Sequence, residues 1–356
     1  MRKFFGPGLV LFFLAPAIGE MTCGNMPPLL FFRPPALACV AVLYGGGAIL
    51  VREATLRWHK GWPTLLALGA AYGIIEEGLM VKTFFNPEGA PGFLGSYGRW
   101  LEVNWVWALD LTIYHAAYSI GTAILVVELM FPSRRHHRWV GKWGQVVLGS
   151  VLAADVLAGY LFFAAEGVPN TPPYRPAFGP YAGAAALVVL LIVVARYLPT
   201  GAGSAALPAR QPAGGPAARP VWFWLTGFLG TLVFFFDSWV LPHMVPYPAV
   251  TWLMTAACVV GVTWLLVWMS GGGAAWTDRQ RLALAAGPLT FFMLFDGLIE
   301  FTGAGPKNTR GMLLVGAAIL VMLLLLRRSI RRRLAANVPA ANASGEGPRP
   351  KAEAAG

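Results

Sequence analysis

The stretch WPTLLALGAAYGIIEEGLMVK, residues 62–82, decides the fold class of this chain. Residues 62–75 carry no charge, and the run is long enough to cross an apolar membrane core, which takes about 20 helical residues. Lipid offers backbone groups no hydrogen-bond partners, so such a run must be a helix. Two adjacent acids, Glu76 and Glu77, stand where hydrocarbon is expected, and any functional reading has to explain them.

Apolar runs of this kind recur along the whole chain. The composition is 57% hydrophobic and 12% charged, whereas soluble domains carry about 25% charged residues. The sequence therefore predicts an all-α, polytopic transmembrane helix bundle of about ten spans. The predicted spans are residues 4–19, 35–51, 62–82, 103–131, 143–165, 180–198, 221–241, 248–269, 282–302 and 311–327.

The basic residues test this assignment and orient it. Suppose that every run crosses and that the N-terminus is cytoplasmic. The outer segments then hold six cationic residues, which are Arg33, Lys82, Arg99, Arg175, Lys307 and Arg310. The other 21 of the 27 Lys and Arg residues fall in inner segments. Because basic residues concentrate in cytoplasmic loops, we expect both termini to be cytoplasmic.

Composition also divides the chain. Residues 199–220 are rich in Gly, Pro and Ala, and we expect a flexible linker between a bundle at 1–198 (spans one to six) and a bundle at 221–327 (spans seven to ten). Residues 328–356 are predicted to be a basic, disordered cytoplasmic tail. The run at 1–19 has a basic start and an Ala-Pro-Ala, so it reads as a membrane anchor or as a cleaved signal.

Carboxylates within the spans outnumber cationic groups. An ionised acid at the bilayer centre costs roughly 2.5–3.5 kcal/mol on insertion scales. Protonation, a water-filled cavity or a bound cation would each lower this cost. The only candidate base at depth is His115. The acids at depth are Glu76, Glu77, Asp110, Asp155, Asp237, Asp296 and Glu300.

Spacing along the helices refines this pattern. Gly69 and Gly73 allow a neighbouring helix to come close, and Glu77 continues their stripe into the bundle. Asp296 and Glu300 are four residues apart, so we expect them to share a helix face and one proton or cation. Tyr114 lies four residues after Asp110, within reach of a hydrogen bond to it.

Two adjacent glutamates on one membrane helix and a histidine on the next resemble part of the pattern of the CPBP family of glutamic intramembrane proteases. That pattern places an Arg four residues after the second Glu and a Phe four residues before the His. In this chain those positions are Val81 and Leu111, and a third motif is missing because Tyr247 follows His243 at its spacing. The resemblance implies only that Glu76 or Glu77 activates water with help from His115.

We therefore expect a transporter-like membrane protein with an intramembrane proton or cation site, and favour this over an enzyme. The alternatives are an intramembrane hydrolase that uses Glu76, Glu77 and His115, or a non-catalytic scaffold. The site would comprise Glu76, Glu77, Asp237, Asp296 and Glu300. Asp110, Tyr114, His115 and Asp155 would support it. We expect no metal centre and no cofactor beyond a bound proton or small cation. The expected partners are the lipid bilayer of a prokaryotic plasma (inner) membrane and anionic head groups at the basic inner loops and tail, but not nucleic acid.

Overall fold

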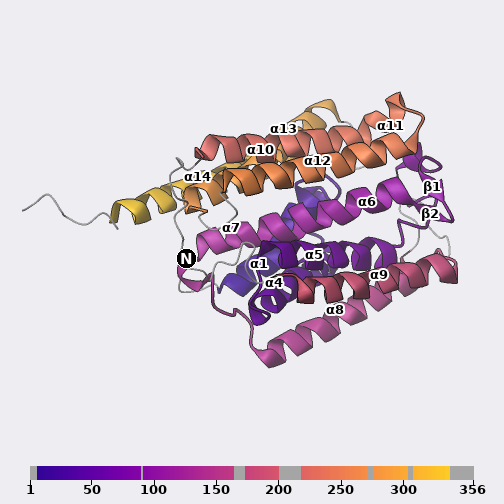
Figure 1. Cartoon of the computed structure of the whole chain (residues 1–356), viewed down its shortest axis with the longest axis horizontal. Coiled ribbons are helices and arrows are strands. Elements are labelled where there is room, and N and C mark those ends of the chain that lie inside the picture. Colours follow the sequence, from indigo (N-terminus) through magenta and orange to yellow (C-terminus); the bar gives the residue numbers. More distant parts are fainter. Residues whose placement is uncertain are drawn as a thin grey trace, which may run out of the picture.

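The computed structural model describes residues 6–89, 91–163, 173–199, 218–270, 276–303 and 308–336. Within these residues the chain is an all-α bundle, and its long helices follow the predicted apolar runs (Figure 1). The segments are α1 (Pro7–Pro16), η1 (Ala17–Met21), α2 (Pro28–Phe31), α3 (Pro34–Val40), η2 (Ala41–Gly46), α4 (Gly47–Arg57), α5 (Trp62–Gly73), η3 (Ile74–Met80), η4 (Gly92–Leu94), β1 (Arg99–Trp100), β2 (Val103–Asn104), α6 (Trp105–Tyr114), η5 (His115–Thr122), α7 (Ala123–Met130), η6 (Pro132–Arg134), α8 (Lys142–Phe162), α9 (Phe178–Tyr197), α10 (Pro220–Trp239), α11 (Leu241–Met244), α12 (Pro248–Met269), α13 (Asp278–Thr302) and α14 (Met312–Ala336).

Eight of the described helices are long and apolar enough to cross a membrane. The other two predicted spans also form helices: Pro7–Met21 is a shorter apolar helix, and Trp62–Met80 runs through α5 and η3. The predicted all-α membrane bundle is therefore confirmed. The eight helices are Pro34–Arg57, Trp105–Met130, Lys142–Phe162, Phe178–Tyr197, Pro220–Trp239, Pro248–Met269, Asp278–Thr302 and Met312–Ala336.

The helix Trp105–Met130 forms the centre of the bundle. Its apolar window is 78% buried, whereas the windows of α8 and α12 are 6% and 11% buried and so face outward. Figure 1 shows α10, α12, α13 and α14 along one side, α8 and α9 along the other, and α1, α4, α5, α6 and α7 between them. The most enclosed positions therefore belong to the helices of the N-terminal half.

The predicted inner segments meet at one end of the bundle. Lys60, after α4, donates a hydrogen bond to the carbonyl of Leu198, after α9. Arg135, after α7, pairs with Asp278 at the start of α13 at 2.7 Å. Arg333 near the end of α14 donates to the carbonyl of Leu129 at 3.3 Å. The predicted inner segments, which carry most of the basic residues, thus lie at the same end of the bundle. That this end faces the cytoplasm stays a prediction.

The predicted tail and linker lie only partly within the described residues. Helix α14 continues to Ala336, so residues 328–336 are helical, which corrects the predicted disorder there. Ile330 is buried within this extension, one turn after buried Leu326, and holds it to the bundle. Most of the predicted linker, residues 200–217, and the tail 337–356 lie outside the described residues, as do residues 1–5.

Four of the inner helices contain a π-helical segment. These segments are η1, η2, η3 and η5, and each continues directly from an α-helix. A π-helical turn accommodates an extra residue, weakens the regular hydrogen-bond ladder and occurs often at functional sites. The helices nevertheless pack closely: a methyl group at Gly45 in η2 would lie 2.1 Å from the carbonyl oxygen of Phe12.

Candidate functional site

The four π-helical segments bring their polar side chains to one buried place. Glu20 comes from η1, Tyr44 from η2, the pair Glu76 and Glu77 from η3, and His115 from η5. We call these five residues the carboxylate cluster. Because an extra residue in a helix changes which side chains face inward, four such segments meeting around acids indicate a built polar site.

His115 is the centre of the cluster. Its Nδ1 lies 3.3 Å from Glu76 Oε2, and its Nε2 lies 3.3 Å from Glu77 Oε1. The hydroxyl of Ser119 lies 3.2 Å from Nδ1 and helps to orient the ring. The side chains of His115 and Glu76 are almost fully buried, while Glu77 remains 14% exposed. One imidazole thus faces a carboxylate on each side.

Hydrogen bonds extend the cluster in two directions. On one side, the Thr83 hydroxyl donates to Glu77 Oε2 at 2.5 Å, just beyond the end of η3. On the other, the Tyr44 hydroxyl donates to Glu20 and also lies beside Glu76. Glu20 accepts a second bond from Asn25 at 2.6 Å. A chain of polar groups therefore runs from Asn25 through the cluster to Thr83.

Glycines let the helices carry these side chains together. A methyl group at Gly19 would lie 2.6 Å from the ring of Tyr44, and one at Gly73 would lie 2.9 Å from His115 Cβ. At Gly69 the methyl would lie 3.0 Å from Ala116 Cα, a backbone atom. The helix that carries the two glutamates thus packs directly on the helix of His115, as the Gly69 and Gly73 stripe predicts.

The cluster has more acidic than basic groups. Three carboxylates accompany one imidazole, and within the described residues their ion pairs involve His115 alone. With all three acids ionised and His115 protonated, two negative charges remain unbalanced. Glu76, Glu77 and His115 each offer one ligand atom, and these atoms lie within 4.8 Å of one another. That spacing is suited to a small bound cation.

The other predicted site residues do not join this cluster. Asp110 and Asp237 lie near each other in a second polar place, where Thr255 donates to Asp110 at 3.4 Å. Asp296 is fully buried, and neither of its carboxylate oxygens has a hydrogen-bond partner in the described part of the chain. Asp155 accepts a bond from the Cys39 thiol at 3.6 Å.

Two predicted hydrogen-bonded pairs are not found in the described residues. Glu300 makes no hydrogen bond to Asp296; it accepts bonds from the backbone N–H groups of Gly311 and Leu313, at 3.1 and 2.6 Å, at the start of α14. Tyr114 does not bond Asp110. It donates to the carbonyl of Gly19 at 2.7 Å.

Glu20, Tyr44, Tyr72 and Thr83 are not among the predicted site residues. The predicted span 4–19 ends one residue before Glu20, whereas the helix continues through η1 and includes it. Tyr72, four residues before Glu76, lies buried beside it.

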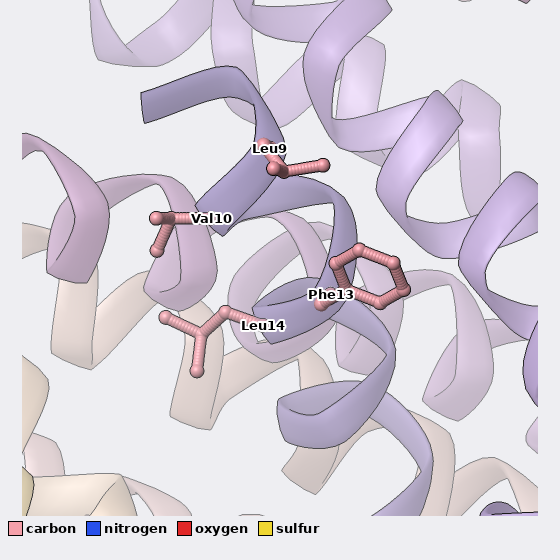
Figure 2. A pocket seen from close by; sticks show the side chains of 4 residues that line it. All are labelled: Leu9, Val10, Phe13 and Leu14. Carbon is pink, nitrogen blue, oxygen red and sulfur yellow. The ribbon is translucent and has the colours of Figure 1, made fainter. Parts of the chain in front are cut away.

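A shallow hollow of about 350 Å³ lies on α1 and is lined by Leu9, Val10, Phe13 and Leu14 (Figure 2). These side chains are all apolar, so the hollow takes no part in the chemistry of the carboxylate cluster.

Comparison with curated proteins and with solved structures yields no match. The model of one protein family, described as an uncharacterized membrane protein family, matches residues 9–345, which include every helix that carries the carboxylate cluster. The match covers nearly the whole chain and agrees with the multi-pass helical bundle. The chain therefore belongs to this uncharacterized membrane protein family.

Proposed function

We propose that this protein is transporter-like and that its carboxylate cluster binds protons or a small cation within the membrane. The observation that carries the proposal is the meeting of the five residues of the carboxylate cluster from four helices, with an excess of acid. Buried charges in a low-dielectric region are costly unless something balances them, and ionisable groups inside membranes commonly mark ion pathways.

The mechanism follows from the charge. When a cation or protons occupy the cluster, the carboxylates are neutralised and the four helices can pack around them. When the site empties, repulsion between Glu76 and Glu77 and their desolvation disfavour the closed packing. The π-helical segments, with their weaker hydrogen-bond ladder, are the parts of these helices best able to adjust. A ligand shifts such an equilibrium only through its different affinity for the two packings.

The location and lipid partners are part of this proposal. We place the protein in the plasma membrane of a prokaryote, with the basic end of the bundle toward the cytoplasm. The exposed side chains of Arg327 and Arg328 on α14 then lie at the level of anionic head groups.

The test is the dependence of thermal unfolding on pH, Na⁺ and Mn²⁺, measured on the purified protein in detergent. A cation at 100 times its dissociation constant stabilises the folded state by about 2.7 kcal/mol. We expect the wild-type midpoint to rise with at least one of these conditions and Glu77→Gln to lose that response. Asp155→Asn, which changes an acid outside the cluster, should keep it. A wild-type midpoint that ignores all three conditions refutes the proposal.

One observation favours an intramembrane hydrolase as the second candidate. Glu77 contacts His115, remains partly exposed, and reaches Thr83 at the end of its helix, so water can approach it. Glu77 would then act as the general base. Under this reading Glu77→Gln binds a fluorescent transmembrane peptide without cleaving it. A non-catalytic scaffold predicts that Glu77→Gln alters stability alone.

A further inference from the structure

A separate group of basic side chains lies at the basic end of the bundle, far along the helices from the carboxylate cluster and distinct from the site of Asp110 and Asp237. A hollow there is lined by residues of α4, α5, α7 and α13 and of the segments that follow α4 and α7. Its charged and titratable lining residues are Arg52, Lys60, Glu128, Arg135, His136 and Arg281. Four side chains with permanent positive charge thus face one hollow that contains a single acid.

Arg52 is a structural member of this wall. Its guanidinium pairs with Glu53 at 3.4 Å and Glu128 at 3.2 Å, and donates to the carbonyls of Arg135 and His137. The same group lies 3.3 Å from the centre of the Trp139 ring. Because these contacts use most of its donors, Arg52 fixes the wall and neutralises Glu128, the acid that would repel an anion.

The remaining guanidinium groups keep free donors. Arg135 pairs with Asp278 through one nitrogen, but its Nε is buried without a hydrogen-bond partner among the described residues. The Nε of Arg281 is also buried without a hydrogen-bond partner among the described residues. A buried N–H that makes no hydrogen bond is costly, so two such groups around one hollow indicate a missing acceptor.

The electrostatic field in the hollow is positive. Burial lowers the pKa of His136, and the neighbouring Arg135, Arg281 and Arg52 lower it further. Even with Glu53 and Asp278 counted beside Glu128, the four cationic side chains exceed the acids by one. An anionic ligand with several oxygen acceptors would satisfy both the charge and the free guanidinium donors.

We propose that this hollow binds a phosphate group, with Arg281 and Arg135 as its main donors and Lys60 beside them. The inference extends the proposed contact between the basic end and anionic lipid, and it is independent of the carboxylate cluster. The hollow lies where α4 and α7 end and where α5 and α13 begin, which is the depth of head groups in a bilayer. Trp62 in its lining is a residue type enriched at that depth.

The experiment measures the thermal midpoint of detergent-solubilised protein with three additives: phosphatidylglycerol, phosphatidylcholine and inorganic phosphate. The variants are Arg281→Gln, Arg135→Gln and the control Arg331→Gln, which removes an exposed cation of the same basic end on α14. We expect phosphatidylglycerol to stabilise the wild type and Arg331→Gln more than phosphatidylcholine does. In Arg281→Gln the phosphatidylglycerol concentration for half the effect should rise about tenfold, since a bond to a charged group is lost.

The inorganic phosphate arm of the experiment distinguishes free phosphate from the phosphate of a lipid head group as the ligand. If it stabilises as phosphatidylglycerol does, the site takes free phosphate. If only the lipid acts, the site takes a lipid head group. Equal losses in Arg281→Gln and Arg331→Gln, or no response to any additive, overturn the proposal. Arg281→Lys, which keeps the charge, should recover part of the response if the glutamine variant folds poorly. The Glu77→Gln test of cation binding is unaffected by any of these results.

Discussion

Replacing Gly69 by Ala should separate two of the helices that build the carboxylate cluster, the one that carries Glu77 and the one that carries His115. The new methyl would lie 3.0 Å from Ala116 Cα and 3.3 Å from the Ala116 carbonyl oxygen. Carbon atoms pack best at about 3.5–4.0 Å, so the helices must part by about 0.5–1 Å. Both obstacles are backbone atoms, which cannot turn away as a side chain can. Overpacking of this kind costs about 1–3 kcal/mol.

The same movement should weaken the site. The contact of His115 with Glu77 is 3.3 Å, and a helix displaced by about 0.5–1 Å would stretch it toward 4 Å, beyond hydrogen-bond range. Gly69→Ala should therefore lose both stability and the response of its thermal midpoint to pH or cations. In Gly73→Ala the new methyl would lie 2.9 Å from His115 Cβ, so it should displace the imidazole directly and also weaken the response.

The assay is the free energy of unfolding from titration with SDS, together with the cation response described above. The matched control is Gly149→Ala on the outward-facing helix α8, where a methyl group meets nothing within 4 Å. It should be neutral or slightly stabilising, because Ala favours a helix over Gly by about 1 kcal/mol. If Gly69→Ala is as stable as Gly149→Ala, the close approach of these helices is not a constraint and the reasoning fails.

Four further substitutions test separate contacts. Glu300→Ala removes the acceptor for the first N–H groups of α14, and we expect a lower unfolding free energy with an unchanged cation response. Asp296→Asn should be neutral or stabilising, because an amide costs less to bury than an unpaired carboxylate; a loss above about 1 kcal/mol would show that the acid has a partner. Arg52→Met leaves Glu53 and Glu128 buried without their cation and should cost about 3–5 kcal/mol by SDS titration. Tyr44→Phe leaves Glu20 without one donor; we expect a loss of about 1–3 kcal/mol, and an unchanged stability would place the Tyr44 hydroxyl outside the cluster.

The fold could be predicted because one requirement dominates it. Each apolar run must satisfy its own backbone in lipid, so runs such as 143–165 and 248–269 could only be helices. Their ends were less certain, since the exit from the membrane is gradual. Helix α13 begins at Asp278, four residues before the predicted 282, because Thr277 and Gln280 form a capping box there. The first predicted span ends at residue 19, and Glu20 is left out of it by a single residue although η1 includes Glu20.

The site was predictable only in part. Glu77 and His115 meet because Gly69 and Gly73 allow it, and those glycines are visible in the sequence. The predicted pairing of Asp296 with Glu300 is not observed, for a reason that spacing along one helix cannot reveal. Glu300 lies three residues before Gly303, the C-cap of α13, and the free N–H groups at the start of α14 bond its carboxylate. Long-range geometry of this kind decides which of several buried acids act together.

The π-helical segments carry a consequence for sequence variation. Each one behaves like a single amino acid added to an otherwise regular coil, and an α-helix turns by about 100° per residue. Deleting one amino acid within η3 would let that helix become regular and leave the residues beyond Met80 facing as before, but it would remove the widened turn, and adjacent acids about 100° apart could not both face His115. Single-residue gaps in these four short stretches should therefore be far more damaging than substitutions at their apolar positions, even though the chain would still insert and fold as a bundle.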